Sequence, residues 1–179
     1  YDIMKDGIKV ALRDRPPSMG GWLGGEAACV YQYHQTHKSA TGSLVGKAVA
    51  YAMGVLELNA SMGLVVAAPT GGSCGVIPGC FLAIQQEYDI PDSTMIEGLF
   101  TAGAVGYLIM KHASVSGAEC GCQAEVGSAS AMAAAGITQV LGGTPAQCLH
   151  AAAYALSNLM GLVCDPVAGL VEVPCHGRN

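Results

Sequence analysis

Charged residues are scarce in this sequence. Of its 179 residues, 12% are Asp, Glu, Lys or Arg and only 8 are basic, whereas ordinary soluble domains have roughly 25% charged residues. Disorder is excluded, because disordered chains combine low hydrophobicity with high charge density. The net charge of −5 also leaves no basic face of the kind that binds nucleic acid. We therefore expect a folded domain that does not bind nucleic acid.

Long uninterrupted apolar runs are absent too, although the mean hydropathy is +0.41. A membrane-spanning helix needs about 20 consecutive apolar residues. The uncharged segments 58–86 and 126–164 are long enough, but Pro69 and Pro145, each close to a glycine pair, interrupt them. Between the breaks Ala, Gly, Ser and Met predominate. This composition favours buried helices that pack through small residues over a membrane protein.

Strand patterns are missing as well, because no segment shows sustained alternation of Val, Ile and Thr with polar residues. Apolar residues instead recur at helical spacing. Helices are predicted from about Ala27, over 41–62, over 76–88, from a Pro91-Asp92-Ser93 cap to about His112, and over 124–141 and 146–160, whereas 161–179 is predicted to be irregular. The predicted fold class is therefore all-α, a compact bundle of buried small-residue helices joined by Gly-rich loops.

The length predicts one domain over 1–179, with an N-terminal helix and linker in 1–23. The chain starts with Tyr1 rather than Met, shows no secretory signal, and ends shortly after a Pro-Cys turn, so we expect residues to be missing from both ends. Without a signal, the 8 cysteines are expected to be reduced thiols of a cytoplasmic protein rather than disulfides.

Three Gly-rich breaks, at 69–79, 114–122 and 161–175, each contain cysteine. The first, Gly71-Gly72-Ser73-Cys74-Gly75, could bind an anion, because consecutive backbone N–H groups ahead of a helix attract carboxylate or phosphate. It lacks the Gly-Lys-Ser/Thr ending of a nucleotide-binding phosphate loop. A close helix crossing that requires small residues explains the same glycines, and the sequence pattern leaves both interpretations open.

Cysteine spacing indicates metal chemistry without defining the metal. Cys120 and Cys122 form a C-x-C pair rather than the C-x₂-C of zinc sites, and Cys164 and Cys175 follow in an irregular segment. Thiolates hold iron–sulfur clusters, and three thiolates on a four-iron cluster leave one iron open. A zinc ion bound by the same cysteines remains an alternative.

Other catalytic arrangements have less support. The G-x-S-x-G elbow of a serine hydrolase and the strands that it needs are missing. Asp165 and Glu172 are expected to act as structural partners in their loop. The histidines lie outside the Gly-rich segments or directly beside a cysteine: His34, His37, His112, His150 and His176.

The Gly-rich segments match a known family. Residues 69–79 (PTGGSCGVIPG), 114–127 (SVSGAECGCQAEVG) and 161–175 (GLVCDPVAGLVEVPC) resemble the α subunit of the bacterial iron–sulfur-dependent L-serine dehydratase. The resemblance covers 24–179 and includes 59–63 (NASMG). It implies a lyase that deaminates L-serine to pyruvate and ammonia by dehydration.

The resemblance further implies a [4Fe–4S] cluster at which the loops converge, with Cys122, Cys164 and Cys175 as ligands. The open iron would act as a Lewis acid on the substrate hydroxyl. Cys74 and Cys120 are not implied as ligands, and neither is pyridoxal phosphate implied as a cofactor. Hydrogen-bond donors for the substrate carboxylate would come from Thr70, Gly71, Gly72, Ser73, Ser114, Ser116 and Gly117.

In this family a β-type subunit or domain contributes a Gly-His-Gly segment near the cluster, and these residues contain no such triplet. We therefore expect the base that removes the Cα proton to come from a β subunit or domain, and we expect an oligomer. The alternatives are a related iron–sulfur lyase, such as L-cysteine desulfidase or threonine dehydratase, and a non-catalytic helical module or membrane protein.

Overall fold

The computed structural model describes residues 1–179 and contains nine α-helices, one 3₁₀ turn, and no strand apart from an isolated bridge between Val167 and Leu170. The helices are α1 Asp2–Asp14, α2 Glu26–Thr36, α3 Gly42–Ala60, α4 Val76–Tyr88, α5 Asp92–His112, α6 Gly117–Cys120, α7 Cys122–Val140, α8 Pro145–Asn158 and α9 Glu172–Arg178, and the 3₁₀ turn η1 is Gly71–Ser73. The all-α prediction is confirmed.

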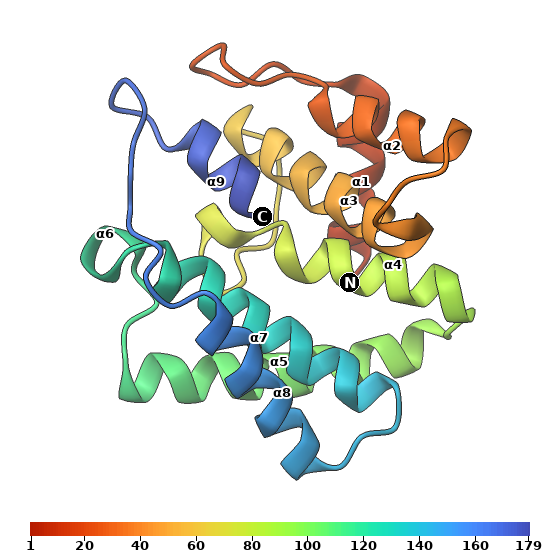
Figure 1. Cartoon of the computed structure of the whole chain (residues 1–179), viewed down its shortest axis with the longest axis vertical. Helices are drawn as coiled ribbons and strands as arrows, with labels where there is room; N and C mark the ends of the chain where they lie inside the picture. Colours follow the sequence, from red (N-terminus) through yellow and green to blue (C-terminus); the bar gives the residue numbers. More distant parts are fainter.

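The helices form two packed groups that meet along α4 and α7 (Figure 1). In one group α3 packs against α1, α2 and α4, and in the other α7 packs against both α5 and α8. The larger core cluster, which includes Phe81, Met95 and Val126, joins α4 to the second group. A smaller cluster with Ile8 and Val55 fills the first group. The short elements α6, α9 and η1 gather near the start of α7, where the Gly-rich segments meet.

Most helices begin and end close to their predicted boundaries. α4 and the end of α5 agree with the prediction, and the ends of α3, α7 and α8 differ by one or two residues. Local signals set these ends: Pro145 lies in the first turn of α8, and Thr144 and Gln147 form a capping box there. Residues 1–23 comprise α1 and most of the loop that leads to α2.

Two short helices lie where the sequence predicts irregular structure. The prediction of an irregular segment over 161–179 is wrong at its end, where α9 forms, and α6 lies within the predicted loop at 114–122. Helices this short are unstable by themselves, so tertiary contacts must hold them. For α9 one such contact is Asn179, whose side chain accepts the N–H of Gly75 at 2.8 Å and donates to the carbonyl oxygen of Gly72 at 2.7 Å.

A buried carboxylate also fastens α9 to the body of the protein. Glu57 of α3 is fully buried, accepts the N–H groups of Gly25 (3.1 Å) and Ala27 (2.7 Å), and lies 3.0 Å from Nε2 of His176. Burial by itself would raise the pKa of Glu57, but the hydrogen bonds from His176 and the two backbone groups lower it below its usual range. This single side chain therefore joins α2, α3 and α9.

Glycines permit the closest helix crossings. A Cβ on Gly98 of α5 would lie 2.9 Å from the carbonyl oxygen of Gly136, and a Cβ on Gly136 of α7 would lie 2.6 Å from that of Gly98. On α4, a Cβ on Gly79 would lie 2.7 Å from the backbone nitrogen of Ala52. These contacts are the packing through small residues that the composition predicts.

Helix α5 has one buried face and one exposed apolar face. Met95, Ala102 and Val105 belong to the larger core cluster, whereas Phe100 and Tyr107 are 78% and 59% exposed. By length and composition α5 is the one helix that could cross a membrane, a test that core helices of soluble proteins also pass. The helix therefore contributes to the core and leaves an apolar surface uncovered.

We expect Gly136→Ala to destabilise the protein by about 1–3 kcal/mol, because the added methyl group would overlap Phe81 and the backbone of Gly98. The matched control is Gly103→Ala on α5. Nothing lies within 4 Å of that position, so the higher helix propensity of Ala should stabilise the protein by roughly 0.5–1 kcal/mol. Urea unfolding measures both changes, and equal effects of the two substitutions would contradict the close crossing.

Glu57→Ala should lower the free energy of unfolding by about 3 kcal/mol, since it leaves His176 and two backbone N–H groups without their partner. The control Glu97→Ala, on the exposed side of α5, should change it by less than about 0.5 kcal/mol. Because the pKa of Glu57 is lowered on folding, its contribution is present above the unfolded pKa and is lost as the pH falls through the folded value. The difference in unfolding free energy between the wild type and Glu57→Ala should therefore become smaller at low pH. A difference that did not change with pH would contradict a lowered pKa of Glu57.

Candidate functional site

The three Gly-rich segments meet at one cavity of about 480 Å³. Its lining includes residues of α6, the first turn of α7 and α9, three elements that Figure 1 shows on the left of the view. The residues that line it come from all three segments: Thr70, Gly72, Val115, Ser116, Gly117, Ala118, Glu125, Cys164, Val171 and Cys175. Segments that are far apart in the sequence thus form a single concave site of the size that holds small molecules.

Four of the seven predicted substrate-binding residues line this cavity, namely Thr70, Gly72, Ser116 and Gly117. The other three, Gly71, Ser73 and Ser114, do not. Ser73 is fully buried, with its Oγ 3.2 Å from that of Thr70. Ser114 donates to Glu119 at 3.1 Å, and the carbonyl oxygen of Gly71 accepts from Asn59 at 3.0 Å. Ser73 and Ser114 therefore have contacts within their own segments, and Gly71 has a contact with α3.

The three predicted ligand cysteines lie around the same site. Cys164 and Cys175 line the cavity, and Cys122 is the buried first residue of α7. Burial raises the pKa of Cys175 to about 12, and the charges of Glu125, Cys122 and Cys164 contribute to the rise.

Arg178 of α9 connects Cys122 to the segment that carries Cys164. Its Nη1 lies 3.1 Å from Sγ of Cys122 and 3.1 Å from the carbonyl oxygen of Val163, and its Nη2 donates to Asp165 at 2.8 Å. The Asp165 hydrogen bond raises the pKa of Arg178, and the guanidinium holds the pKa of Asp165 below its usual range. The segment that carries Cys164 is thereby tied to both α7 and α9.

Asp165 and Glu172 act as structural partners, as the sequence predicts. Asp165 pairs with Arg178, and Glu172 accepts the N–H of Gly20 at 2.8 Å. Glu172 thereby fixes the start of α9 to the loop that follows α1. Neither carboxylate lines the cavity.

Glu125 is a site residue that the sequence analysis missed. Its carboxylate accepts a hydrogen bond from the hydroxyl of Thr70. A Cβ on Gly72 would lie 2.6 Å from Oε1, and one on Gly117 would lie closer still to Oε2. The spacing holds the signal that would have found it, because Cys122 and Glu125 are three residues apart on one face of α7.

The donor set fits an iron–sulfur cluster. All eight cysteines are free thiols in the structure, and thiolates are the ligands that such clusters take. Cys164 and Cys175 line an open cavity, and Cys122, at the start of α7, lies 3.1 Å from Nη1 of Arg178 on α9, the helix that carries Cys175. Cys74 is fully buried in the smaller core cluster, and Cys120 does not line the cavity.

The one group of three His, Cys, Asp or Glu side chains with closely gathered ligand atoms lies outside the cavity and contains no cysteine. Ligand atoms of Glu26, Glu57 and His176 lie within 4.8 Å of one another. The oxygens of Glu57 already accept two backbone N–H groups and lie beside His176. Hydrogen bonding within the protein accounts for this group, and no metal is needed to explain it.

None of the five histidines lines the cavity. His176, although it follows Cys175 in the sequence, lies with its Nε2 3.0 Å from Oε1 of Glu57 and does not line the cavity. His34 and His37 lie in a separate surface pocket, and His150 lies on α8. The structure thus brings no imidazole of this chain to the thiols.

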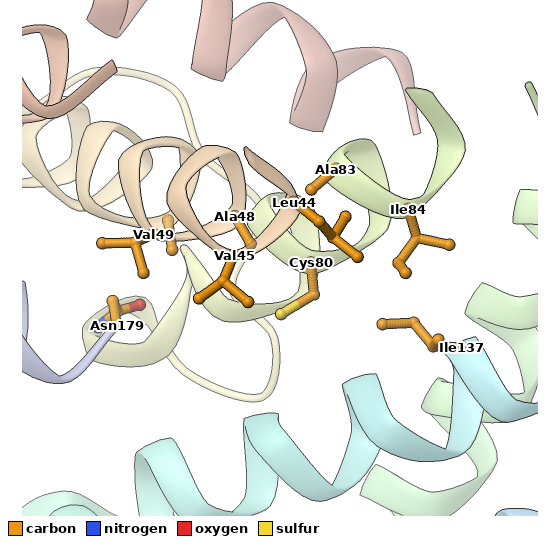
Figure 2. Close-up of a pocket in the computed structure, with 10 residues that line it drawn as sticks. Leu44, Val45, Ala48, Val49, Cys80, Ala83, Ile84, Ile137 and Asn179 are labelled. Carbon is orange, nitrogen blue, oxygen red and sulfur yellow. The ribbon is translucent and has the colours of Figure 1, made fainter. Parts of the chain in front are cut away.

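A second cavity, of about 340 Å³, is almost entirely apolar (Figure 2). It lies between α3, α4 and α7 and is lined by Leu44, Val45, Ala48, Val49, Ala52, Cys80, Ala83, Ile84, Ile137 and Asn179. Its one ionisable side chain is Cys80, whose pKa burial raises to about 11. The cavity therefore lacks the groups that catalysis on a polar substrate requires.

Comparison with known proteins identifies the family of this chain. A family model described as serine dehydratase alpha chain matches residues 1–179. The probable L-serine dehydratase alpha chain of Bacillus subtilis is 51% identical over 162 residues, which cover 90% of this chain and 54% of the relative. The L-serine dehydratase alpha chain of Peptoniphilus asaccharolyticus is 48% identical over 157 residues, 88% of this chain and 54% of the relative.

The L-serine dehydratase TdcG of Escherichia coli is 50% identical over 131 residues, which cover 72% of this chain and 29% of that protein. This chain thus spans about half the length of the two alpha-chain relatives and a smaller share of TdcG. Because the family model matches the chain from its first residue to its last, the chain belongs to the serine dehydratase alpha chain family.

Proposed function

We propose that this chain is the cluster- and substrate-binding part of an enzyme that converts L-serine to pyruvate and ammonia. The observation that carries the proposal is the convergence of the thiol-bearing and Thr/Ser-bearing Gly-rich segments on one cavity. The names of the relatives, all L-serine dehydratases or their alpha chains, support the choice of reaction.

A [4Fe–4S] cluster is the cofactor that we propose, held by Cys122, Cys164 and Cys175. When bound, such a cluster with one open iron supplies a Lewis acid for the β-hydroxyl of the substrate, which is otherwise a poor leaving group. The thiol of Cys175 has a raised pKa in the structure. A thiolate at this position therefore needs a cation beside it, which the iron of a cluster would provide.

The polar residues of the cavity hold the substrate. Ser116 accepts the N–H of Glu119 through its Oγ at 3.4 Å, so its own hydroxyl hydrogen is available to the substrate carboxylate. Thr70 already donates to Glu125, which fixes the orientation of both side chains. Gly72 and Gly117 leave room because neither has a side chain to fill the cavity.

The overall reaction removes water from serine and then returns it. Loss of the Cα proton and the β-hydroxyl gives an aminoacrylate, which tautomerises to an imine, and hydrolysis of that imine yields pyruvate and ammonia. Removal of the Cα proton needs a base within about 3 Å, or one intervening water. No histidine of this chain lines the cavity, and Glu125, which does, is hydrogen-bonded to Thr70. As the resemblance implies, we propose that a β subunit or domain supplies the base in an oligomeric, cytoplasmic enzyme.

Replacing Cys122, Cys164 or Cys175 singly by Ala should abolish cluster binding, because each substitution removes one of three ligands. Iron and acid-labile sulfide, measured after anaerobic reconstitution, report the loss directly. The matched control is Cys148→Ala on α8, a buried thiol outside the cavity, which should keep the cluster and lose only packing energy. Four irons retained in Cys164→Ala would contradict the ligand assignment.

Anaerobically reconstituted chain by itself should form little pyruvate from L-serine, and mixing it with the corresponding β chain should restore turnover, because the base is expected there. L-Cysteine, L-threonine and L-serine assayed in parallel, with detection of sulfide, 2-oxobutyrate and pyruvate, test the choice of substrate. Full turnover by this chain without a partner would show that the base lies within it.

A further inference from the structure

The carboxylate of Glu125 lies at the junction of two loops of the candidate site. Thr70 donates its hydroxyl hydrogen to Oε1, and Gly72 lies on the same side. Gly117, from the next Gly-rich segment, lies against Oε2. Two positions thus lack a Cβ where a Cβ would displace this carboxylate, which indicates that the loops are built to accommodate it.

No cation of the protein neutralises Glu125. The seven ion pairs in the structure do not include it. The nearby guanidinium of Arg178 is held by Asp165 and by Cys122. Glu125 therefore brings an uncompensated negative charge to the cavity.

One oxygen of this carboxylate is free to bind a ligand. Oε1 accepts from Thr70, whereas Oε2 accepts no hydrogen bond from the protein. The solvent-inaccessible side-chain oxygens without a hydrogen-bond partner are those of Ser128 and Glu172. Oε2 of Glu125 is not among them, so it is accessible, and Glu125 lines the cavity. An acceptor in this position suits a ligand that donates hydrogen bonds.

The surroundings favour a cationic donor. Glu125 is the one charged side chain that lines the cavity, and no Lys, Arg or His lines it. A partly buried carboxylate without a counter-ion is unfavourable, and an ammonium group offers both the charge and the N–H donors that it lacks.

We propose that Glu125 binds the α-ammonium group of the substrate and so selects amino acids over the corresponding hydroxy acids. The inference rests on the proposed function, in which an amino acid enters the thiol-bordered cavity. Thr70 is then a positioning residue, because it holds the Glu125 carboxylate through Oε1 and leaves Oε2 for the ligand.

A purely structural role would give different results. Glu125 lies in the first turn of α7, where a carboxylate stabilises the positive end of the helix. In that role its loss would lower stability and affect all ligands of the cavity equally. Discrimination between an amino group and a hydroxyl group is the measurement that separates the two roles.

The test uses two unreactive ligands that differ only in this group, L-alanine and L-lactate, neither of which has a β-hydroxyl to lose. Calorimetric titration of the iron-loaded enzyme, assembled from this chain and its partner, measures both affinities. We expect L-alanine to bind more tightly, and Glu125→Gln to weaken it by roughly 10- to 100-fold while L-lactate changes by less than about threefold. The control is Glu119→Gln, an exposed carboxylate outside the cavity, which should preserve the preference.

Several results would overturn the inference. One is a wild-type enzyme that binds both ligands equally, and this measurement does not depend on the folding of any variant. Another is a Glu125→Gln enzyme that still prefers L-alanine to L-lactate. A lower kcat for L-serine in that variant would not rescue the inference if the preference remained. Glu125→Asp, which retains the charge, should keep part of the preference, and a complete loss would count against a charge-based role.

Pyruvate formation from L-serine by the wild-type enzyme tests the proposed function separately. An enzyme that prefers L-alanine through Glu125 but forms no pyruvate from L-serine would retain this inference and refute the proposed reaction. An enzyme that forms pyruvate but shows no preference between L-alanine and L-lactate would do the reverse.

Discussion

The candidate site depends on the attachment of one seven-residue helix, α9, to the body of the protein. That helix carries Cys175 into the cavity and places Arg178 between Cys122 and Asp165. A helix of this length does not form unaided. Glu57, fully buried and 3.0 Å from His176, is one of the contacts that hold it. The burial of this carboxylate on α3 is therefore a condition for the geometry of the thiols.

The glycines of the site have two separate physical functions. Gly98 and Gly136 allow α5 and α7 to approach within backbone contact, which positions the helix that carries Cys122 and Glu125. Gly72 and Gly117 instead leave space for the carboxylate of Glu125. Within residues 71–75, a close helix crossing explains Gly75, where a Cβ would overlap the carbonyl oxygen of Ala52. Anion binding by the same segment stays a prediction.

The cavity and its surroundings contain more acidic groups than basic ones. Three thiols and one carboxylate come together with a single nearby guanidinium, and that guanidinium is paired with Asp165. A positively charged ligand would stabilise the deprotonated thiols and the carboxylate. The proposed metal cluster and the proposed ammonium group of the substrate are two chemically distinct ligands of this kind.

The sequence by itself determined the elements of this fold and the segments that carry the site. Its helical spacing and the scarcity of strand patterns predict the long helices closely, because their apolar faces and caps are local signals, as at Pro145 and in α4. The Gly-rich segments likewise reveal their thiols and hydroxyls directly in the residue types.

Only the tertiary structure decided which of these groups meet. Helix α9 and the central position of Glu125 depend on contacts between residues more than 50 positions apart, such as that of Thr70 with Glu125 and that of Glu57 with His176. Nothing local to Ser73 or Ser114 shows that their hydroxyls bond within their own loops instead of facing the cavity. The physical reason is that contacts with residues distant in the sequence position a short helix or a carboxylate without a counter-ion. The periodicity of the chain does not indicate which residues make those contacts.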